Sequence, residues 1–263
     1  MPLVEVNGVQ LLVEGAGTGD PVVLVHGSWD TREVWALVEP ELTSAYRVVS
    51  YDRRGHGASG DSAQPGVRRD DEDDLAALIE GRGLAPAHVV GNSFGASVTL
   101  GLAARRPDLF RSICVHEPPL FSVVPPVAQK FRADMAPVAE LIEQGDHRGG
   151  AKLFVDTVIG PGIWDELSTD EQGALITNAA TFLGELRDPV FDAIDLESLA
   201  KLPGRVLLTR GDQSPPYFAP VVAELARLPP VEVTLIPGAG HEPHLTHSTE
   251  FVALVQDFVS RAG

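Results

Sequence analysis

The stretch that decides the fold is His88-Val89-Val90-Gly91-Asn92-Ser93-Phe94-Gly95-Ala96-Ser97, in which an apolar run leads into Gly-x-Ser-x-Gly and then into small residues. This order of strand, tight turn and helix is typical of a nucleophile elbow. Side chains at Gly91 and Gly95 would collide with their surroundings, and Ser93 would project above the sheet edge. The free N–H groups of the following helix favour an oxyanion there, so a catalytic serine is predicted. The alternative is a glycine-rich turn with an incidental serine.

A serine nucleophile needs a base, and His241 is the best candidate. It lies in the loop Gly238-Ala239-Gly240-His241, between a predicted strand at 231–236 and a predicted helix at 249–259. This loop is expected at the carboxyl edge of the sheet, where Ser93 also emerges. His244 and His247 follow at three-residue steps, but the loop lacks the helix or cysteine partners of known zinc spacings, so no metal is predicted.

Four motifs in this order resemble those of the α/β-hydrolase superfamily, over essentially the whole chain. They are Val22-Val23-Leu24-Val25-His26-Gly27-Ser28-Trp29, Tyr51-Asp52-Arg53-Arg54-Gly55-His56-Gly57-Ala58-Ser59, Gly91-Asn92-Ser93-Phe94-Gly95 and Gly238-Ala239-Gly240-His241. The resemblance implies that the backbone N–H groups of Ser28 and Phe94 form the oxyanion hole. It also implies a structural role for Asp52, Arg53 and Arg54.

The acid that completes the triad has two candidates. The superfamily usually places an Asp three residues beyond a Gly after the strand expected at 205–209, but Ser214 occupies that position and Asp212 lies two residues earlier. Glu117 instead ends the preceding strand and is followed by two prolines. Its His-Glu-x-Pro setting resembles that of the zearalenone-type lactonases, which use Ser, Glu and His. Glu117 is the favoured acid, and Asp212 remains the alternative.

The composition excludes several classes of partner. The 263 residues include 44% hydrophobic ones and carry a net charge of −17, and this charge argues against nucleic acid and anionic membranes as partners.

Cys114 is the only cysteine, so no intramolecular disulfide is possible. The first twenty residues lack Lys, Arg and a long apolar core, so no signal peptide and a cytoplasmic location are expected.

The chain is predicted to form an α/β-hydrolase fold, a mostly parallel sheet flanked by helices with an inserted helical cap. A hairpin at Asn7-Gly8 is followed by strands at 21–25, 47–51, 87–90, 111–115, 205–209 and 231–236, mostly separated by helical segments. The acidic run 70–74 is predicted to begin one of these helices. The core domain is expected to comprise residues 1–117 and 203–263. Residues 118–202 carry apolar residues at helical spacing and are predicted to be the cap.

Aromatic residues of the cap and its neighbours are candidates for lining a substrate pocket, although each could equally pack cap against core. The candidate substrate-binding residues are Trp29, Phe121, Phe154, Trp164, Phe182, Phe191 and Tyr217. A covered pocket would favour a compact apolar molecule over a polymer.

The predicted function is cofactor-independent hydrolysis of a small carboxylic ester or lactone through an acyl-enzyme, with a macrocyclic lactone such as zearalenone as one option. Hydrolysis of a C–C bond, perhydrolase chemistry and a slow or non-catalytic small-molecule receptor on the same fold are the alternatives. Whether the chain forms a homodimer is left open by the sequence.

Overall fold

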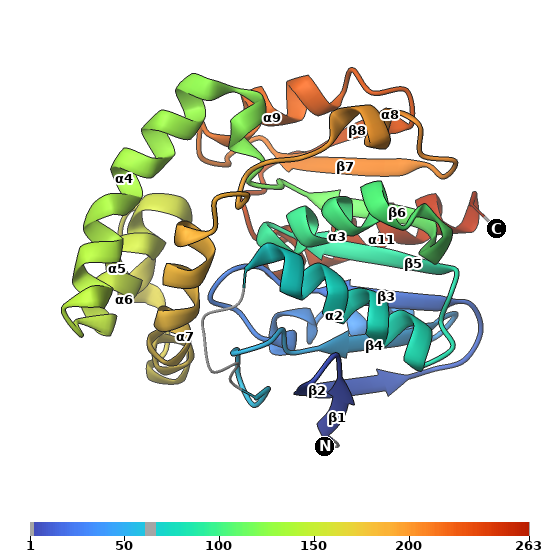
Figure 1. Ribbon diagram of the computed structural model, residues 1–263, viewed down its shortest axis with the longest axis horizontal. Coiled ribbons are helices and arrows are strands. Elements are labelled where there is room, and N and C mark those ends of the chain that lie inside the picture. The colour runs from blue at the N-terminus through green and yellow to red at the C-terminus, as the bar shows by residue number, and fades with distance from the viewer. Residues whose placement is uncertain (1–2, 61–66, 263) are drawn as a thin grey trace.

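The computed structural model describes residues 3–60 and 67–262 of the chain. An eight-stranded sheet runs through the centre and has helices on both faces (Figure 1). The strands are β1 (Leu3–Val6), β2 (Val9–Ala16), β3 (Pro21–Val25), β4 (Arg47–Tyr51), β5 (Ala87–Asn92), β6 (Phe110–His116), β7 (Val206–Gly211) and β8 (Val231–Ile236).

The strand order across the sheet is β1-β2-β4-β3-β5-β6-β7-β8. Strands β3 to β8 are parallel, whereas the β1–β2 hairpin joins β4 in antiparallel orientation. Asn7 and Gly8 form the hairpin turn, and both have positive φ (46° and 78°), as a two-residue turn of this kind requires. The predicted fold class is confirmed.

Helices cover both faces of the sheet, so the central parallel strands β3, β5 and β6 are buried on both sides, whereas the edge strand β8 is partly exposed. The helices are α1 (Glu39–Leu42), α2 (Arg68–Gly81), α3 (Phe94–Arg105), α4 (Pro125–Glu143), α5 (His147–Val158), α6 (Ile163–Glu166), α7 (Thr169–Arg187), α8 (Leu196–Ala200), α9 (Phe218–Leu225), α10 (Pro243–Thr246) and α11 (Ser248–Ser260), with 3-10 turns η1 (Arg32–Trp35), η2 (Pro107–Leu109) and η3 (Phe121–Val123).

Successive side chains of the central strands enter two separate apolar clusters, because side chains alternate across a strand. Val23 and Val25 of β3 belong to the larger cluster, which includes residues of α2 and α3. Val22 and Leu24 of the same strand belong to the other cluster, beneath α11. The helix predicted from the acidic run is present as α2.

Residues 118–202 leave the sheet after β6 and return to it at β7. Helices α4 to α7 of this insertion gather together beyond one end of the sheet (Figure 1). Helix α8 lies instead along the sheet and contacts α3. None of the helices in the described part of the chain has the length and apolar character needed to cross a membrane.

The carboxyl ends of the parallel strands meet along one edge of the sheet, so the residues that follow them are brought close together. The register shows this directly, because Asn92 at the end of β5 pairs with His116 at the end of β6. Gly211 at the end of β7 pairs with Ile236 at the end of β8. Ser93 follows the end of β5, Glu117 follows the end of β6, and the loop that holds His241 follows the end of β8. All three therefore lie at the same edge of the sheet.

The stability of the protein should depend on the apolar side chains that the central strands bury against the helices. Leu24→Ala removes a fully buried side chain from a central strand, and we expect a loss of about 2–5 kcal/mol in the free energy of unfolding. Leu235→Ala on the edge strand β8 is the matched control, since Leu235 is 50% exposed, and its effect should stay within about 0.5 kcal/mol. Urea unfolding of both variants measures the difference, and equal losses would contradict the assignment of the core.

Candidate active site

The turn after β5 holds Ser93 in a conformation that few non-glycine residues adopt, with φ of 52° and ψ of −122°. A Cβ on Gly91 would lie 2.6 Å from the carbonyl oxygen of Gly95. A Cβ on Gly95 would lie 2.3 Å from the carbonyl oxygen of Val25. Both glycines are therefore required by close backbone contacts, and the sequence-based reason for them is confirmed.

Glu117 and His241 form a buried hydrogen-bonded pair beside this turn. His241 Nδ1 lies 2.7 Å from Glu117 Oε2, and neither residue is more than 2% exposed. The other carboxylate oxygen, Oε1, accepts a hydrogen bond of 3.0 Å from the backbone N–H of Gly211 at the end of β7. The carboxylate is thus fixed at both oxygens, and Glu117 itself has a positive φ of 45°.

The pair determines which nitrogen of His241 carries the proton. Burial alone would raise the pKa of the Glu117 carboxyl, but His116 and His241 lower it to about 2, so it is ionised and can only accept. Nδ1 of His241 must then donate, which leaves Nε2 as a proton acceptor. Burial by itself would lower the pKa of His241, but the Glu117 hydrogen bond and charge raise it above its ordinary value of 6.5.

Asp212, the alternative acid, lies on the surface and bonds to groups other than His241. Its side chain is exposed and accepts a hydrogen bond of 2.8 Å from the backbone N–H of Gly238 and one of 3.0 Å from Gln213 Nε2. The Gly238 contact joins the loop after β7 to the loop after β8. The carboxylate that the structure pairs with His241 is that of Glu117.

A second histidine, His116, lies next to the pair. Its Nδ1 is 2.9 Å from Thr209 Oγ1, and its Nε2 is 3.5 Å from Glu117 Oε2. Ligand-type atoms of His116, Glu117 and His241 lie within 4.8 Å of one another. The histidine spacing in the sequence pointed to His241, His244 and His247 as a possible cluster, and it gave no sign that His116 lies beside His241. His116 is the last residue of β6 and pairs with Thr209 of β7, and this strand pairing places its side chain beside Glu117.

The loop after β3 lies directly against the serine turn. A Cβ on Gly27 would lie 3.2 Å from Ser93 Cβ and 3.0 Å from Asp30 Oδ2. Ser28 follows Gly27 and is half-buried. Phe94 is the first residue of α3, where an N–H group has no acceptor within the helix. The two residues predicted to form the oxyanion hole therefore lie on the two segments that meet at Ser93.

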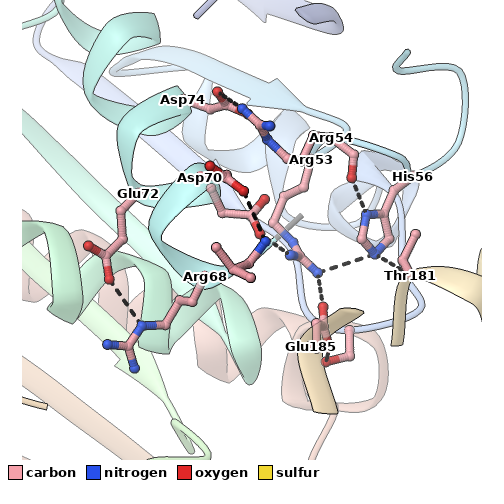
Figure 2. Close-up of polar contacts among 12 residues, drawn as sticks. Arg53, Arg54, His56, Arg68, Asp70, Glu72, Asp74, Thr181 and Glu185 are labelled. Carbon is pink, nitrogen blue, oxygen red and sulfur yellow. Dashed lines mark hydrogen bonds and ion pairs between the residues drawn. The ribbon is translucent and has the colours of Figure 1, made fainter. Parts of the chain in front are cut away.

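Asp52, Arg53 and Arg54 make the contacts of structural residues. Asp52 accepts hydrogen bonds from the backbone N–H groups of Arg32 and Ala58. Arg54 pairs with the buried carboxylate of Asp74, 2.6 Å away. Arg53 is buried and pairs with carboxylates on α2 and on α7, and Figure 2 shows the second of these contacts crossing from the core to the insertion.

Three of the predicted substrate-binding aromatics form one cluster where the insertion meets the loop after β3. The ring centroids of Trp29 and Phe154 are 4.9 Å apart, those of Trp29 and Phe182 are 5.1 Å apart, and those of Phe154 and Phe182 are 4.9 Å apart. Trp29 has a positive φ of 67°, which turns the chain just beyond Ser28.

A second set of aromatic rings connects Phe94 with His241 through successive contacts. Successive ring contacts run from Phe94 through Phe191, Phe131 and Phe121 to Phe218, and Tyr217 contacts both Phe121 and Phe131. At its end, Phe218 stacks on His241 with centroids 4.3 Å apart and an interplanar angle of 14°. Phe121, Phe191 and Tyr217 are candidates from the sequence, whereas Phe131 and Phe218 join them only in the structure. Phe218 adjoins Tyr217, and that adjacency was the available signal.

Trp164 is not part of either set among the described ring contacts. It is 2% exposed on α6, and the Arg148 guanidinium lies 5.5 Å from its ring centroid. Its carbonyl oxygen accepts a hydrogen bond from Gln172 Nε2 on α7. These are packing contacts within the insertion.

Comparison with known proteins identifies the family of the chain. The sequence profile of the "Alpha/beta hydrolase family" matches residues 22–254, so the chain belongs to that family. A curated relative, 2-hydroxymuconate semialdehyde hydrolase of Pseudomonas sp. (strain CF600), is 34% identical over 110 residues. This match covers 40% of the chain and 39% of the relative, so the similar region spans about two fifths of each protein.

Solved structures match the whole fold. A thermophilic esterase from Thermogutta terrifontis superposes with a TM-score of 0.80 at 22% identity and covers 99% of this chain and 97% of its own. Est816, described as an N-acyl homoserine lactone degrading enzyme, has a TM-score of 0.77 at 20% identity and covers 98% of this chain and 100% of its own. At these identities the likeness is one of fold.

The two carboxylates can be distinguished by titration of His241. Its NMR midpoint should lie above 6.5, because Glu117 stabilises the imidazolium. Glu117→Gln removes that charge while keeping the shape, so the midpoint should move to lower pH. Asp212→Asn, the matched control, should leave it unchanged. A shift in the Asp212 variant and none in the Glu117 variant would reverse the pairing.

Proposed function

We propose that this chain is a serine hydrolase that cleaves a carboxylic ester or lactone of a small, largely apolar molecule through an acyl-enzyme. The single observation that carries the proposal is the buried Glu117–His241 pair at the sheet edge where Ser93 is held in a strained turn. A histidine whose Nδ1 is held by a carboxylate has Nε2 available to take a proton from a serine. Family membership supports the same reaction class.

In the first half of the reaction, Nε2 of His241 accepts the proton of the Ser93 hydroxyl while Ser93 Oγ attacks the carbonyl carbon. The oxygen becomes negatively charged and accepts hydrogen bonds from the N–H groups of Ser28 and Phe94. The positive end of α3 adds to this stabilisation. Glu117 stabilises the imidazolium, which then gives its proton to the leaving alcohol, and the acyl group stays on Ser93.

In the second half, a water molecule loses a proton to His241 Nε2 and attacks the acyl carbon. The same two N–H groups hold the second oxyanion, and Ser93 leaves with the proton from the imidazolium. In a lactone the leaving alcohol belongs to the acyl group, so one product is released. No metal or cofactor takes part in this scheme.

The substrate class follows from the surroundings of the site. We propose that α4 to α7 act as a cap and that the aromatic rings between Phe94 and His241 present an apolar wall to the substrate. The N-acyl homoserine lactone degrading enzyme and the esterase among the structural neighbours share this fold and accord with a lactone or ester. We therefore infer a compact ester or lactone with an apolar acyl or alcohol part.

A second candidate reaction is hydrolysis of a C–C bond. It is favoured by the similarity to the relative named 2-hydroxymuconate semialdehyde hydrolase. A substrate panel should contain short aryl esters, a macrocyclic lactone such as zearalenone, an acyl homoserine lactone and 2-hydroxymuconate semialdehyde. The class with the highest kcat/KM defines the reaction.

Ser93→Ala should lower turnover of the best ester on the order of 10³-fold or more, because only oxyanion binding remains. The parent should be labelled by a fluorophosphonate once per chain and the variant not at all, and thermal unfolding should be nearly unchanged. Near-normal turnover in the variant would refute the serine mechanism. Labelling of the parent without multiple turnover of any substrate in the panel would indicate a receptor instead.

Phe154→Ala should change substrate preference. The residue belongs to the cluster with Trp29, so its loss should lower kcat/KM for a large ester more than for an acetate ester, since remote contacts position large substrates. Trp164→Ala is the control, because Trp164 packs within the insertion and should affect both esters alike. Equal losses in the Phe154 variant would show that its ring serves packing only.

A further inference from the structure

The peptide unit between Gly27 and Ser28 is held at its carbonyl end. Arg53 Nη2 donates a hydrogen bond of 3.0 Å to the Gly27 oxygen, and His26 Nδ1 lies 2.9 Å from the same atom. Nε2 of His26 accepts from the backbone N–H of Arg53 at 2.9 Å, so Nδ1 is the donor. In a planar trans peptide the C=O and N–H point in opposite directions. Fixing the Gly27 oxygen therefore fixes the direction of the Ser28 N–H.

The side chain of Ser28 is held by the insertion. Its hydroxyl donates a hydrogen bond of 2.5 Å to Oε2 of Glu185, a residue of α7 that is distant in sequence. Oε1 of the same carboxylate accepts from Arg53 Nη2 at 2.8 Å. One carboxylate thus holds Ser28 directly and, through Arg53, the peptide unit that precedes it. Figure 2 shows Glu185 reaching Arg53 from the α7 side.

The Arg53–Glu185 ion pair is buried, so each charge depends on its partners for stabilisation. Arg53 is 1% exposed and Glu185 is 3% exposed. Asp71 of α2 gives Arg53 its second carboxylate, 3.0 Å away. Arg53 also lies over the ring of Phe94, with its guanidinium carbon 4.8 Å from the centroid. Removal of one buried partner leaves the others uncompensated, so the group is expected to act as a unit.

Two more residues on the same face of α7 bind the loops around the site. Asn178 Nδ2 donates to the carbonyl oxygen of Trp29 at 2.8 Å, and Asn178 Oδ1 accepts from the N–H of Gly57 at 3.2 Å. Thr181 Oγ1 lies 3.0 Å from His56 Nε2. Asn178, Thr181 and Glu185 are spaced by three and four residues, which places them along one side of a helix.

We propose that Glu185 of α7 is a positioning residue that fixes the Ser28 N–H for the oxyanion, by holding Ser28 Oγ and Arg53 Nη2 at the same time. The proposal rests on the proposed function, because it assigns an oxyanion role to that N–H. It makes docking of the insertion a condition for a complete oxyanion hole, and it gives the buried Arg53 a part in orienting the site.

The test compares Glu185→Gln with Glu72→Gln in the full chain. Glu72 is a matched control because it is a buried carboxylate paired with Arg68 and Arg105, away from the loop after β3. Glu185→Gln should lower kcat for an aryl ester by about 10–10²-fold with little change in KM, since an oxyanion donor acts mainly in the transition state. Affinity for a trifluoromethyl ketone, which forms a tetrahedral adduct, should fall by a similar factor. Glu72→Gln should leave both quantities near those of the parent.

A second readout does not depend on activity. Amide hydrogen exchange of a peptide covering residues 26–31 should become faster in Glu185→Gln and remain unchanged in Glu72→Gln. Unchanged exchange in Glu185→Gln, or equal losses of kcat in both variants, would overturn the proposal.

Two further variants separate the possible failures. Ser28→Ala removes only the hydroxyl and keeps the Arg53–Glu185 ion pair. It should lower kcat in the same direction but by less than Glu185→Gln does. This variant tests the proposal even if Glu185→Gln does not fold. Unaltered kcat in Ser28→Ala would then count against the proposal. If Ser93→Ala keeps the activity of the parent, the serine mechanism fails, and the exchange measurement alone decides whether Glu185 holds this loop.

Discussion

The site depends on one close backbone contact, that of Gly95 with the end of β3. A Cβ at this position would lie 2.3 Å from the Val25 oxygen and 2.4 Å from the His26 oxygen, so only glycine lets α3 begin there. The contact sets the N-terminus of α3 against the loop that carries Ser28. Strand pairing then supplies the remaining groups, because β6 ends beside β5 and β7 ends beside β6. The arrangement is thus a consequence of sheet packing rather than of any single loop.

Strain and burial are concentrated at this edge. Four non-glycine residues of the described chain have positive φ, and three of them, Trp29, Ser93 and Glu117, belong to the candidate site. Such conformations persist only where the surrounding contacts enforce them. Here those contacts include the hydrogen bond from the Ser93 N–H to the His116 oxygen, 2.9 Å long, and the bond from Gly211 to Glu117. These hydrogen bonds hold Ser93 and Glu117 in their positive-φ conformations.

The insertion joins this edge by two kinds of contact. Apolar rings pack Phe154 and Phe182 against Trp29, whereas a buried polar face of α7 binds the loops that surround Ser93. Ring packing tolerates small displacements, but charged hydrogen bonds demand a fixed geometry. The polar face therefore constrains the position of α7 more closely than the rings do.

The sequence by itself determined the order of strands and helices, the elbow at Ser93 and the loop of His241, because hydrophobic alternation and glycine-rich turns are local properties of the chain. It also favoured Glu117, which a strand end and two prolines mark locally. Only the tertiary structure decided that Glu117 rather than Asp212 bonds His241, that Phe218 stacks on His241, and that Glu185 reaches Ser28. These relations join residues up to 157 positions apart, as Ser28 and Glu185 are, and such contacts leave no periodic pattern in the chain.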